Sequence, residues 1–350
     1  MAVHWRTLSS RGQQSKKTQQ IRLHYFIRKP RAQENFSIER LFDAIISALP
    51  EQHFAVRRLI CPFYSNGIFR RILLVVWAAL HQGDINHVTG DVDFLCLLMR
   101  RRSTVVTIHD IGSLHRLRGF RRRLYETFWL RLPLYRADEV TTASETSRAE
   151  IQRFAPRARH IRVIPNCFSK DIQIQPKPFR CDLPRILQVG TRPNKNLERV
   201  ISALRGLHCE LVVVGKLTLA QSNLLDRCGI RYENHVNLSD SALLDQYRSA
   251  DLVVFMSTYE GFGLPILEAQ AIGRPIVTSN REPMRSVAGT GARTVDPFDT
   301  DEIRRGIEDV IRSPALRKTL IEAGRRNVER YSPASIASQY ASLYLEMYRA

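Results

Sequence analysis

The sequence lacks the long hydrophobic run that a membrane-spanning helix requires. Its longest uninterrupted apolar stretch is nine residues, Ile72 to Leu80, whereas a spanning helix takes about 20. Residues 1–20 contain no apolar core of the kind found in secretory signal peptides, so we expect no such signal there. The six cysteines are scattered, without a CxxC pair or a Cys/His cluster, which argues against a zinc site or a disulfide framework. These absences favour a cytoplasmic protein in a reducing compartment.

Acidic residues are scarce, above all in the first half of the chain. The 350 residues include 53 Lys and Arg against 34 Asp and Glu, a net charge of +19. Residues 1–182 hold 31 basic and 15 acidic residues, and residues 183–350 hold 22 and 19. This asymmetry indicates either an anionic partner for the first half or a solvated basic face. No nucleic-acid recognition motif accompanies the charge, which disfavours nucleic acid as that partner.

Short apolar runs alternate with amphipathic stretches along most of the chain, the pattern of an α/β fold with parallel sheets. Residues 1–20 are polar and basic and are expected to form a flexible tail. Prolines at 176, 178 and 184 interrupt the pattern, so we expect two doubly wound, Rossmann-like domains at 21–175 and 184–332. Strands are expected at 21–27, 105–108, 140–143, 185–189, 210–214, 252–256 and 275–278, and helices at 37–49, 121–134, 197–204, 241–249, 266–272, 301–312, 315–329 and 336–348.

The segment Tyr259–Ala269 (YEGFGLPILEA) carries the strongest functional signal. It follows a buried strand and opens a helix, where Pro265 suits the first turn and Gly273 suits the carboxyl cap. Glycines at such a turn let backbone amides approach a phosphate. Two glutamates spaced in this way could also be ordinary surface residues, but the strand–loop–helix setting favours a ligand site.

Two further strand ends carry chemically active side chains. Val189–Leu197 (VGTRPNKNL) places Arg192 and Lys195 at the start of a helix, where they could neutralise a diphosphate or simply be solvated. His109 and Asp110 follow the expected strand at 105–108. A lone histidine is often structural, and we interpret His87 in that way.

These three segments resemble the retaining glycosyltransferases of family 4, which have the GT-B fold of two Rossmann-like domains facing a central cleft. The resemblance runs from about Ile21 to Tyr348 and is densest in 185–300. It implies a metal-independent enzyme without a cofactor that moves a sugar from a nucleotide-diphosphate sugar to an acceptor, with retention of configuration. The sequence shows no Asp-x-Asp pair placed for a metal ion. The resemblance further implies polysaccharide or glycolipid synthesis.

The resemblance also assigns roles to individual residues. Glu260 and His109 would face the donor sugar and form the catalytic pair, and Glu268 would bind the ribose. The remaining expected donor-binding residues are Arg192, Lys195, Gly261, Phe262 and Gly263. Two residues are weaker candidates: Asp110, which would orient His109, and Asn280 in the family-like segment Asn280–Met284, which would close over the nucleotide. The first domain would face the acceptor, and residues 333–350 would form a helix that returns to it.

The first half of the chain departs from the family pattern after its first strand. Many members have a glycine pair there, whereas this chain has the glycine-free loop Arg28–Asn35. Its basic residues Arg28, Lys29 and Arg31 either replace backbone amides as phosphate ligands or are solvated. A basic, aromatic helix at 121–134, preceded by Arg116 and Arg118, could lie on an anionic membrane or pack its aromatic rings in the core.

Two other functions remain open at this stage. A sugar-nucleotide epimerase or hydrolase could use the same cleft without an acceptor. A basic module that binds polyanions would account for the charge alone. The acceptor is equally open, between a lipid-linked molecule and a saccharide.

Overall fold

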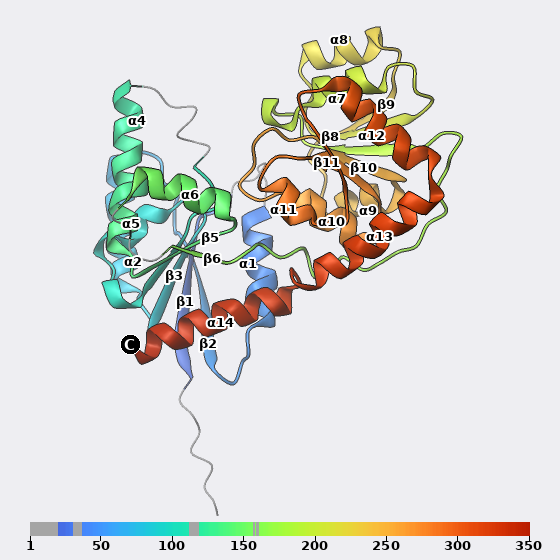
Figure 1. The fold of residues 1–350 in the computed structure, drawn as a ribbon. Coiled ribbons are helices and arrows are strands. Elements are labelled where there is room, and N and C mark those ends of the chain that lie inside the picture. Colours follow the sequence, from blue (N-terminus) through green and yellow to red (C-terminus); the bar gives the residue numbers. More distant parts are fainter. Residues whose placement is uncertain (1–19, 31–36, 112–118, 157, 159–160) are drawn as a thin grey trace, which may run out of the picture.

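Two parallel six-stranded sheets form the framework of the protein. A computed structural model describes residues 20–30, 37–111, 119–156, 158 and 161–350. The strand order is β2-β1-β3-β4-β5-β6 in the first sheet and β12-β11-β10-β7-β8-β9 in the second, and every pairing is parallel. Figure 1 shows the two sheets in separate lobes with helices packed around them. The expected pair of doubly wound domains is therefore confirmed.

Strands β3 and β4 of the first sheet are buried at every residue, because helices cover both faces of the sheet there. In β1 (Ile21–Ile27), Leu23 and Tyr25 face the core beneath α1, whereas Phe26 faces the core beneath α2. The other strands are β2 (Phe54–Ile60), β3 (Ile85–Thr89), β4 (Thr104–Thr107), β5 (Glu139–Thr142) and β6 (Ile161–Val163). The helices are α1 (Ser37–Ala48), α2 (Ile68–Leu80), α4 (Gly119–Tyr125), α5 (Leu132–Arg136) and α6 (Glu145–Phe154), with short 3-10 turns at Asp93–Leu98 and Arg101–Ser103.

The second sheet repeats this arrangement with its own two cores. One core lies under α7, α8 and α12, and the other lies under α9, α10 and α11. The strands are β7 (Arg185–Val189), β8 (Glu210–Val214), β9 (Arg231–His235), β10 (Leu252–Phe255), β11 (Ile276–Ser279) and β12 (Arg293–Val295). The helices are α7 (Leu197–Leu204), α8 (Leu219–Arg227), α9 (Asp240–Ser249), α10 (Leu264–Ile272), α11 (Met284–Ala288), α12 (Thr300–Arg312) and α13 (Pro314–Glu329).

The last helix, α14 (Pro333–Arg349), packs on the first sheet although it follows the second in sequence (Figure 1). The hydroxyl of Tyr344 lies 2.6 Å from that of Tyr25 and 2.6 Å from Nδ1 of His87. The other ring nitrogen of His87 lies 2.6 Å from the Thr107 hydroxyl. This buried polar chain joins α14 to three neighbouring strands, so the helix is part of the first domain's core.

The structure gives the setting of His87 and of the expected helix at 121–134. His87 lies inside β3 and is fully buried. Its interpretation as a structural histidine is confirmed. The expected helix at 121–134 is a continuous helical segment from 119 to 136 that includes a π-helical stretch, Glu126–Arg131. None of the helices in the described part of the chain is long and apolar enough to cross a bilayer.

Candidate donor-sugar site

The loop between β10 and α10 is shaped by its glycines and its proline. Gly263 caps the amino end of α10 with a φ of 112°, a left-handed conformation that glycine adopts without strain. Pro265 stands in the first turn, and Gly273 caps the carboxyl end with a φ of 81°. The predicted strand–loop–helix context of the motif is confirmed. The α10 amino terminus therefore sits at the carboxyl edge of the sheet, where parallel α/β folds bind ligands.

Two motifs that are far apart in sequence meet at this edge. The Lys195 ammonium donates to Oε1 of Glu260 at 2.6 Å, and Asn194 donates to the same oxygen at 3.2 Å. The lysine also lies over the ring of Phe255, 4.7 Å from its centre. Both ionised side chains are largely buried, with exposed fractions of 19% for Lys195 and 16% for Glu260. Each charge is therefore held in place by the other.

Gly190 shows why this lysine is so closely positioned. Its φ is 95°, and a Cβ added there would lie 2.9 Å from Cγ of Lys195. Any other residue would be strained and would push the lysine out of its position. The glycine of the Val189–Leu197 segment is thus needed to place the positive charge.

The second domain touches the first at Gly261. A Cβ added to this glycine would lie 2.6 Å from the carbonyl oxygen of His109 and 2.9 Å from Cβ of Asp110. The Gly261 carbonyl accepts hydrogen bonds from the hydroxyls of Ser144 at 2.8 Å and Ser147 at 3.2 Å. Glu260, Gly261, His109 and Asp110, which the sequence placed in different domains, therefore lie in one region of the structure.

His109 is a neutral imidazole held against the cleft. Burial lowers its pKa, and the neighbouring Asp110 raises it by less. Its Nε2 is buried and has no hydrogen-bond partner among the described residues. The ring packs edge-on against Phe42, with 6.0 Å between the ring centres. A neutral histidine with one nitrogen available can donate or accept a hydrogen bond at a sugar hydroxyl.

Glu268 is oriented by a residue that the sequence reading missed. The phenol of Tyr247, in α9, donates to its carboxylate at 2.6 Å. Burial raises the pKa of Glu268, and this hydrogen bond, together with the positive charges of Arg40 and Lys195, opposes that rise. The carboxylate thus lies near a hydrogen-bond donor, Tyr247, and the positive charges of Arg40 and Lys195.

The loop backbone supplies further donors. In the described part of the chain, the amides of Gly261, Phe262 and Gly263 make no hydrogen bond to the protein. The Phe262 ring is buried and packs edge-on against Tyr331, 5.9 Å away between centres. The aromatic side chain anchors the loop in the core while its backbone stays at the cleft. Such amides at a helix start form an anion site.

Comparison with known proteins identifies the family. A model described as Glycosyltransferase Family 4 matches residues 18–171, and one described as Glycosyl transferases group 1 matches residues 169–327. The chain belongs to glycosyltransferase family 4. Its fold is GT-B, and a structure of HepE from Anabaena in complex with UDP and glucose superimposes with a TM-score of 0.73. That match has 17% identity and covers 93% of this chain and 100% of the other.

Two curated relatives are named as mannosyltransferases. The MMP α-(1→4)-mannosyltransferase of Mycolicibacterium hassiacum is 32% identical over 59% of this chain and 53% of its own length. The O-antigen chain mannosyltransferase B of Escherichia coli is 28% identical over 70% of this chain and 71% of its own length. The chain thus matches about half of the first relative and more of the second.

Two of the expected family 4 donor-site residues are not drawn into this cluster. The Arg192 side chain is exposed at the start of the turn that carries Lys195. Asn280 is exposed just after β11. Beside it, Arg281 and Arg199 both lie over the ring of Phe298, at 5.5 and 5.2 Å. This cation–aromatic group could not be predicted from the sequence, because its members come from three separate parts of the chain.

Two contacts between the domains could also not be predicted from the sequence. Arg40 in α1 pairs with Asp240 in α9 at 3.0 Å. The Tyr259 hydroxyl donates to Glu150 at 2.9 Å. Each joins residues from different domains, so only the packing of the domains brings them together. These contacts help to hold the two domains together.

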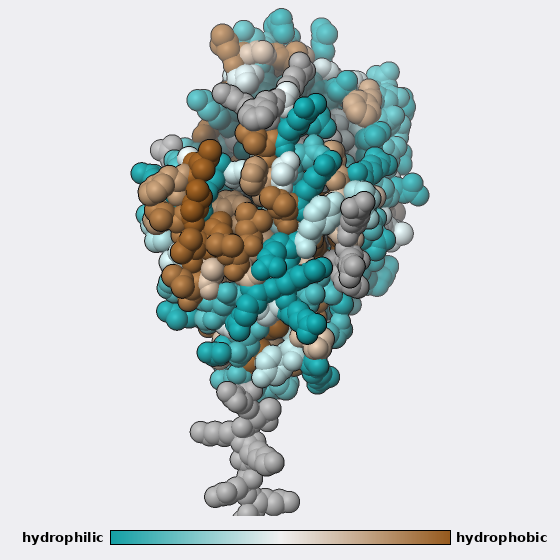
Figure 2. All heavy atoms as spheres, turned by 90° about the vertical axis from the view of Figure 1, so that its left-hand side faces the viewer, coloured by the Kyte–Doolittle hydropathy of each residue, from teal (hydrophilic) through white to brown (hydrophobic). Residues whose placement is uncertain are grey.

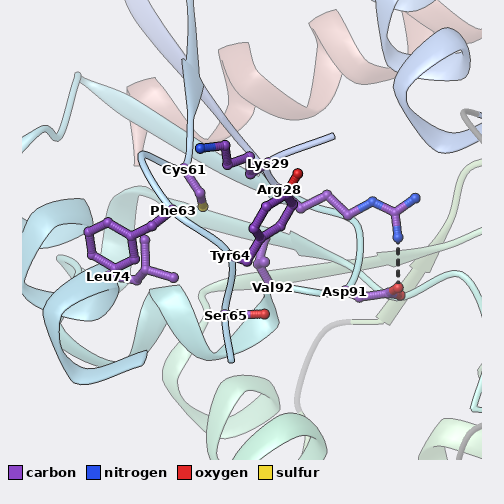
Figure 3. Close-up of a pocket in the computed structure, with 9 residues that line it drawn as sticks. All are labelled: Arg28, Lys29, Cys61, Phe63, Tyr64, Ser65, Leu74, Asp91 and Val92. Carbon is purple, nitrogen blue, oxygen red and sulfur yellow. Dashed lines mark hydrogen bonds and ion pairs between the residues drawn. The ribbon is translucent and has the colours of Figure 1, made fainter. Parts of the chain in front are cut away.

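A small pocket lies in the first domain (Figure 3). Its lining residues are Arg28, Lys29, Cys61, Phe63, Tyr64, Ser65, Leu74, Asp91 and Val92. Arg28 is not solvated, because it pairs with Glu39 at 2.7 Å and with Asp91 at 3.0 Å. Lys29 lies over the Tyr64 ring at 5.2 Å. Arg31, the third basic residue of this loop, lies outside the described residues.

Side chains and backbone amides supply the positive charge around the candidate donor site. Among the residues that the structure describes, no three His, Cys, Asp or Glu side chains form a group that could hold a metal ion. Asp91 is committed to Arg28, and burial raises the pKa of Asp93 far above its ordinary range. Lys195 is therefore the cation that the described residues offer closest to Glu260.

Proposed function

We propose that the protein transfers a sugar from a nucleotide-diphosphate sugar to an acceptor with retention of anomeric configuration. The observation that carries this proposal is the convergence of Lys195, Glu260 and the 261–263 amides with His109 across the cleft. Membership of family 4 supports it.

The geometry suggests a division of roles around the donor. Glu268, held by Tyr247, would accept two hydrogen bonds from the ribose diol. Lys195 and the amides of Gly261 and Gly263 would hold the diphosphate. Glu260 and His109 would contact the donor sugar from the two sides of the cleft.

The reaction would be a displacement on one face of the sugar. The bond from the anomeric carbon to the diphosphate oxygen breaks, and a bond to the acceptor hydroxyl forms on the same face. The hydroxyl proton passes to the departing phosphate oxygen. Positive charge from Lys195 and the loop amides would stabilise that oxygen, the role of preorganised charge in catalysis. The acceptor hydroxyl itself is the nucleophile in this scheme, so no covalent sugar–enzyme intermediate forms.

The transferred group is proposed to be a hexose, in the synthesis of a polysaccharide or glycolipid in the cytoplasm. The two relatives named as mannosyltransferases support a hexose donor. The structure in complex with UDP and glucose supports a nucleotide-diphosphate sugar.

Calorimetric titration with a panel of UDP-, GDP- and ADP-sugars tests the donor site. We expect one nucleotide to bind, and Glu268→Ala to weaken binding by about tenfold to a hundredfold, since a hydrogen bond to a charged group contributes about 1.5–3 kcal/mol. Glu322→Ala, an exposed glutamate of α13 in the same domain, is the matched control. Binding that Glu268→Ala leaves intact would overturn the ribose role. Nucleotide release at full rate without an acceptor would favour hydrolysis over transfer.

A further inference from the structure

Helix α2 exposes a stripe of large apolar side chains. Ile68, Phe69 and Leu80 are 76%, 73% and 78% exposed. Ile72, Leu73 and Val76 are also exposed and continue the stripe between them at helical spacing. The opposite face of the helix, with Leu74, Val75 and Ala78, is buried in the core. The helix is thus apolar on both sides, and only one of them is covered by the protein.

A second helical segment extends this apolar face. Leu124, Phe128, Leu132 and Tyr135 are exposed at spacings of three or four residues along the continuous helix from 119 to 136. The two helices touch, because the Arg71 guanidinium lies 4.1 Å from the ring centre of Trp129. Figure 2 shows the result as a broad brown patch on the side of the molecule that carries these helices.

The aromatic rings of the 119–136 helix divide between core and surface. Tyr125 stacks on Trp129 with 5.7 Å between ring centres, and Trp129 packs on Phe94 at 5.4 Å. Phe128 points outward and is 44% exposed. Core packing, one of the two alternatives that the sequence left open for this helix, therefore holds for Tyr125 and Trp129, whereas Phe128 is exposed.

The charge around the patch is predominantly basic. No acidic residue occurs from Gln52 to Gly83 or from Phe94 to His109. Exposed arginines flank the apolar stripes at Arg70, Arg100, Arg101, Arg102, Arg122 and Arg123. The loop of arginines at 100–102 lies by the carboxyl end of α2, since the Arg100 amide donates to Gln82 at 2.7 Å. Glu126, the acidic residue on the 119–136 helix, is paired with Arg131 at 2.5 Å.

We propose that this face, defined by the exposed apolar residues of α2 and of the 119–136 helix together with their flanking arginines, docks on an anionic lipid bilayer. An apolar stripe bordered by arginines is the chemistry of helices that lie in the plane of a membrane interface. Each basic residue near an anionic surface contributes about 1 kcal/mol. The apolar side chains would enter the interface while the arginines contact lipid phosphates.

A second copy of the chain fits this face less well. In a two-fold symmetric dimer the same patch meets itself. The arginine borders of the two copies would then face each other without acidic partners. An anionic bilayer instead places negatively charged lipids opposite all of the flanking arginines.

The docking would bring the acceptor side of the cleft to the membrane. The loop that contains Phe63, Tyr64 and Ser65 lines the pocket of Figure 3 and leads directly into α2. Leu74 of α2 itself contacts that pocket. This position suits an acceptor anchored in lipid, a consequence that rests on the proposed sugar transfer, whereas the docking itself does not.

Vesicle flotation of the full chain tests the proposal. We expect flotation with vesicles of phosphatidylcholine mixed with phosphatidylglycerol, and little with phosphatidylcholine alone. The triple variant F69S/I72S/V76S should lose flotation, whereas Leu219→Ser, which removes a 79% exposed side chain from the second domain, should retain it. Because all four side chains are exposed, these variants should fold, and unchanged donor binding with an unchanged melting curve verifies this.

The arginines are tested separately. R70Q/R101Q/R102Q should weaken binding to anionic vesicles by about a hundredfold or more, and added salt should weaken the wild type in the same direction. R325Q/R326Q, two exposed arginines of α13, is the matched control. Equal recovery with neutral and anionic vesicles would overturn the proposal. So would flotation that the α2 variant leaves intact, or a dimer of the wild type that the α2 variant dissolves.

Discussion

The two domains of this family 4 glycosyltransferase have the same sheet architecture but carry their function in different ways. In the second domain, the proposed donor-site residues sit on adjacent loops and hold one another, as Lys195 and Glu260 do. In the first domain, the buried polar residues, such as His87 and Tyr344, connect strands to α14 and stay away from solvent. Its distinctive chemistry lies on the surface, in arginines and exposed apolar side chains.

The contrast also holds for exposed apolar residues. Those of the second sheet domain, Leu219, Val236 and Phe298, come from separate elements. Isolated residues of this kind are normal on protein surfaces. In the first domain most of them gather on two touching helices. The difference teaches that two domains with the same core design can differ in what they present to solvent, one in its loops and the other on its outer face.

The largest effect that would sharpen this comparison comes from removing Lys195. Lys195→Ala takes away the cation nearest Glu260 and leaves that largely buried carboxylate without its ion pair. We expect the turnover number to fall by about a hundredfold to a thousandfold, the typical cost of losing one stabilising group at a developing charge. Steady-state kinetics measures this, with Lys318→Ala of α13 as the exposed control. Normal turnover in Lys195→Ala would mean that another group stabilises the departing diphosphate.

A smaller effect is expected where the two domains meet. In Gly261→Ala the new Cβ would lie 2.6 Å from the His109 carbonyl, so the first domain must shift away. Misplacement by about 1 Å can cost up to about a hundredfold in rate. We therefore expect turnover to fall by tens of fold while donor affinity, measured by calorimetry, stays close to that of the wild type. Loss of donor affinity with unchanged turnover would show that the contact serves the second domain alone.

The smallest effect concerns pH and the first domain's core. Burial lowers the pKa of His87 to about 3, so the folded protein keeps this histidine neutral while the unfolded chain protonates it below about pH 6.5. Its contribution to stability is therefore full above pH 6.5 and is lost as the pH falls toward 3, by at most about 1.4 kcal/mol per pH unit. His87→Gln should be less stable at pH 7, because its bonds to Tyr344 and Thr107 change, but should have a shallower pH slope.

Tryptophan fluorescence can follow this transition in the first domain. The chain has three tryptophans, all within its first 130 residues, and Trp77 and Trp129 pack on the core beneath α2. Denaturant titrations at pH 7 and pH 5 would compare the wild type, His87→Gln and His208→Gln, which changes an exposed histidine of the second domain. Equal slopes in all three proteins would rule out His87 as the source of the pH dependence.

The sequence predicted those parts of the fold that depend on residues close together in the chain. The strand at 21–27 is confirmed to the residue, as is the helix at 197–204. The context of the Glu260 motif is also confirmed, because Pro265 and Gly273 are local signals of a helix start and end. Roles for Glu260, His109 and the other site residues stay predictions.

Contacts between distant elements could not be predicted. Tyr247 reaches Glu268 from another helix, and Arg40 reaches Asp240 from the other domain. Neither pair has a fixed spacing in sequence. The exposed face of α2 was hidden for a different reason. The run from Ile72 to Leu80 is apolar on every side, so its pattern alone does not tell which side the protein covers.

The position of α14 has a consequence for synthesis of the chain. The core of the first sheet includes Ile336, Tyr340 and Tyr344, which the ribosome adds after every residue of the second sheet. Domains usually finish folding in the order in which they are made. Here the second domain can complete its core first, while the first waits with Tyr25 and His87 uncovered. The nascent first domain is thus the part of the chain that most needs protection from aggregation.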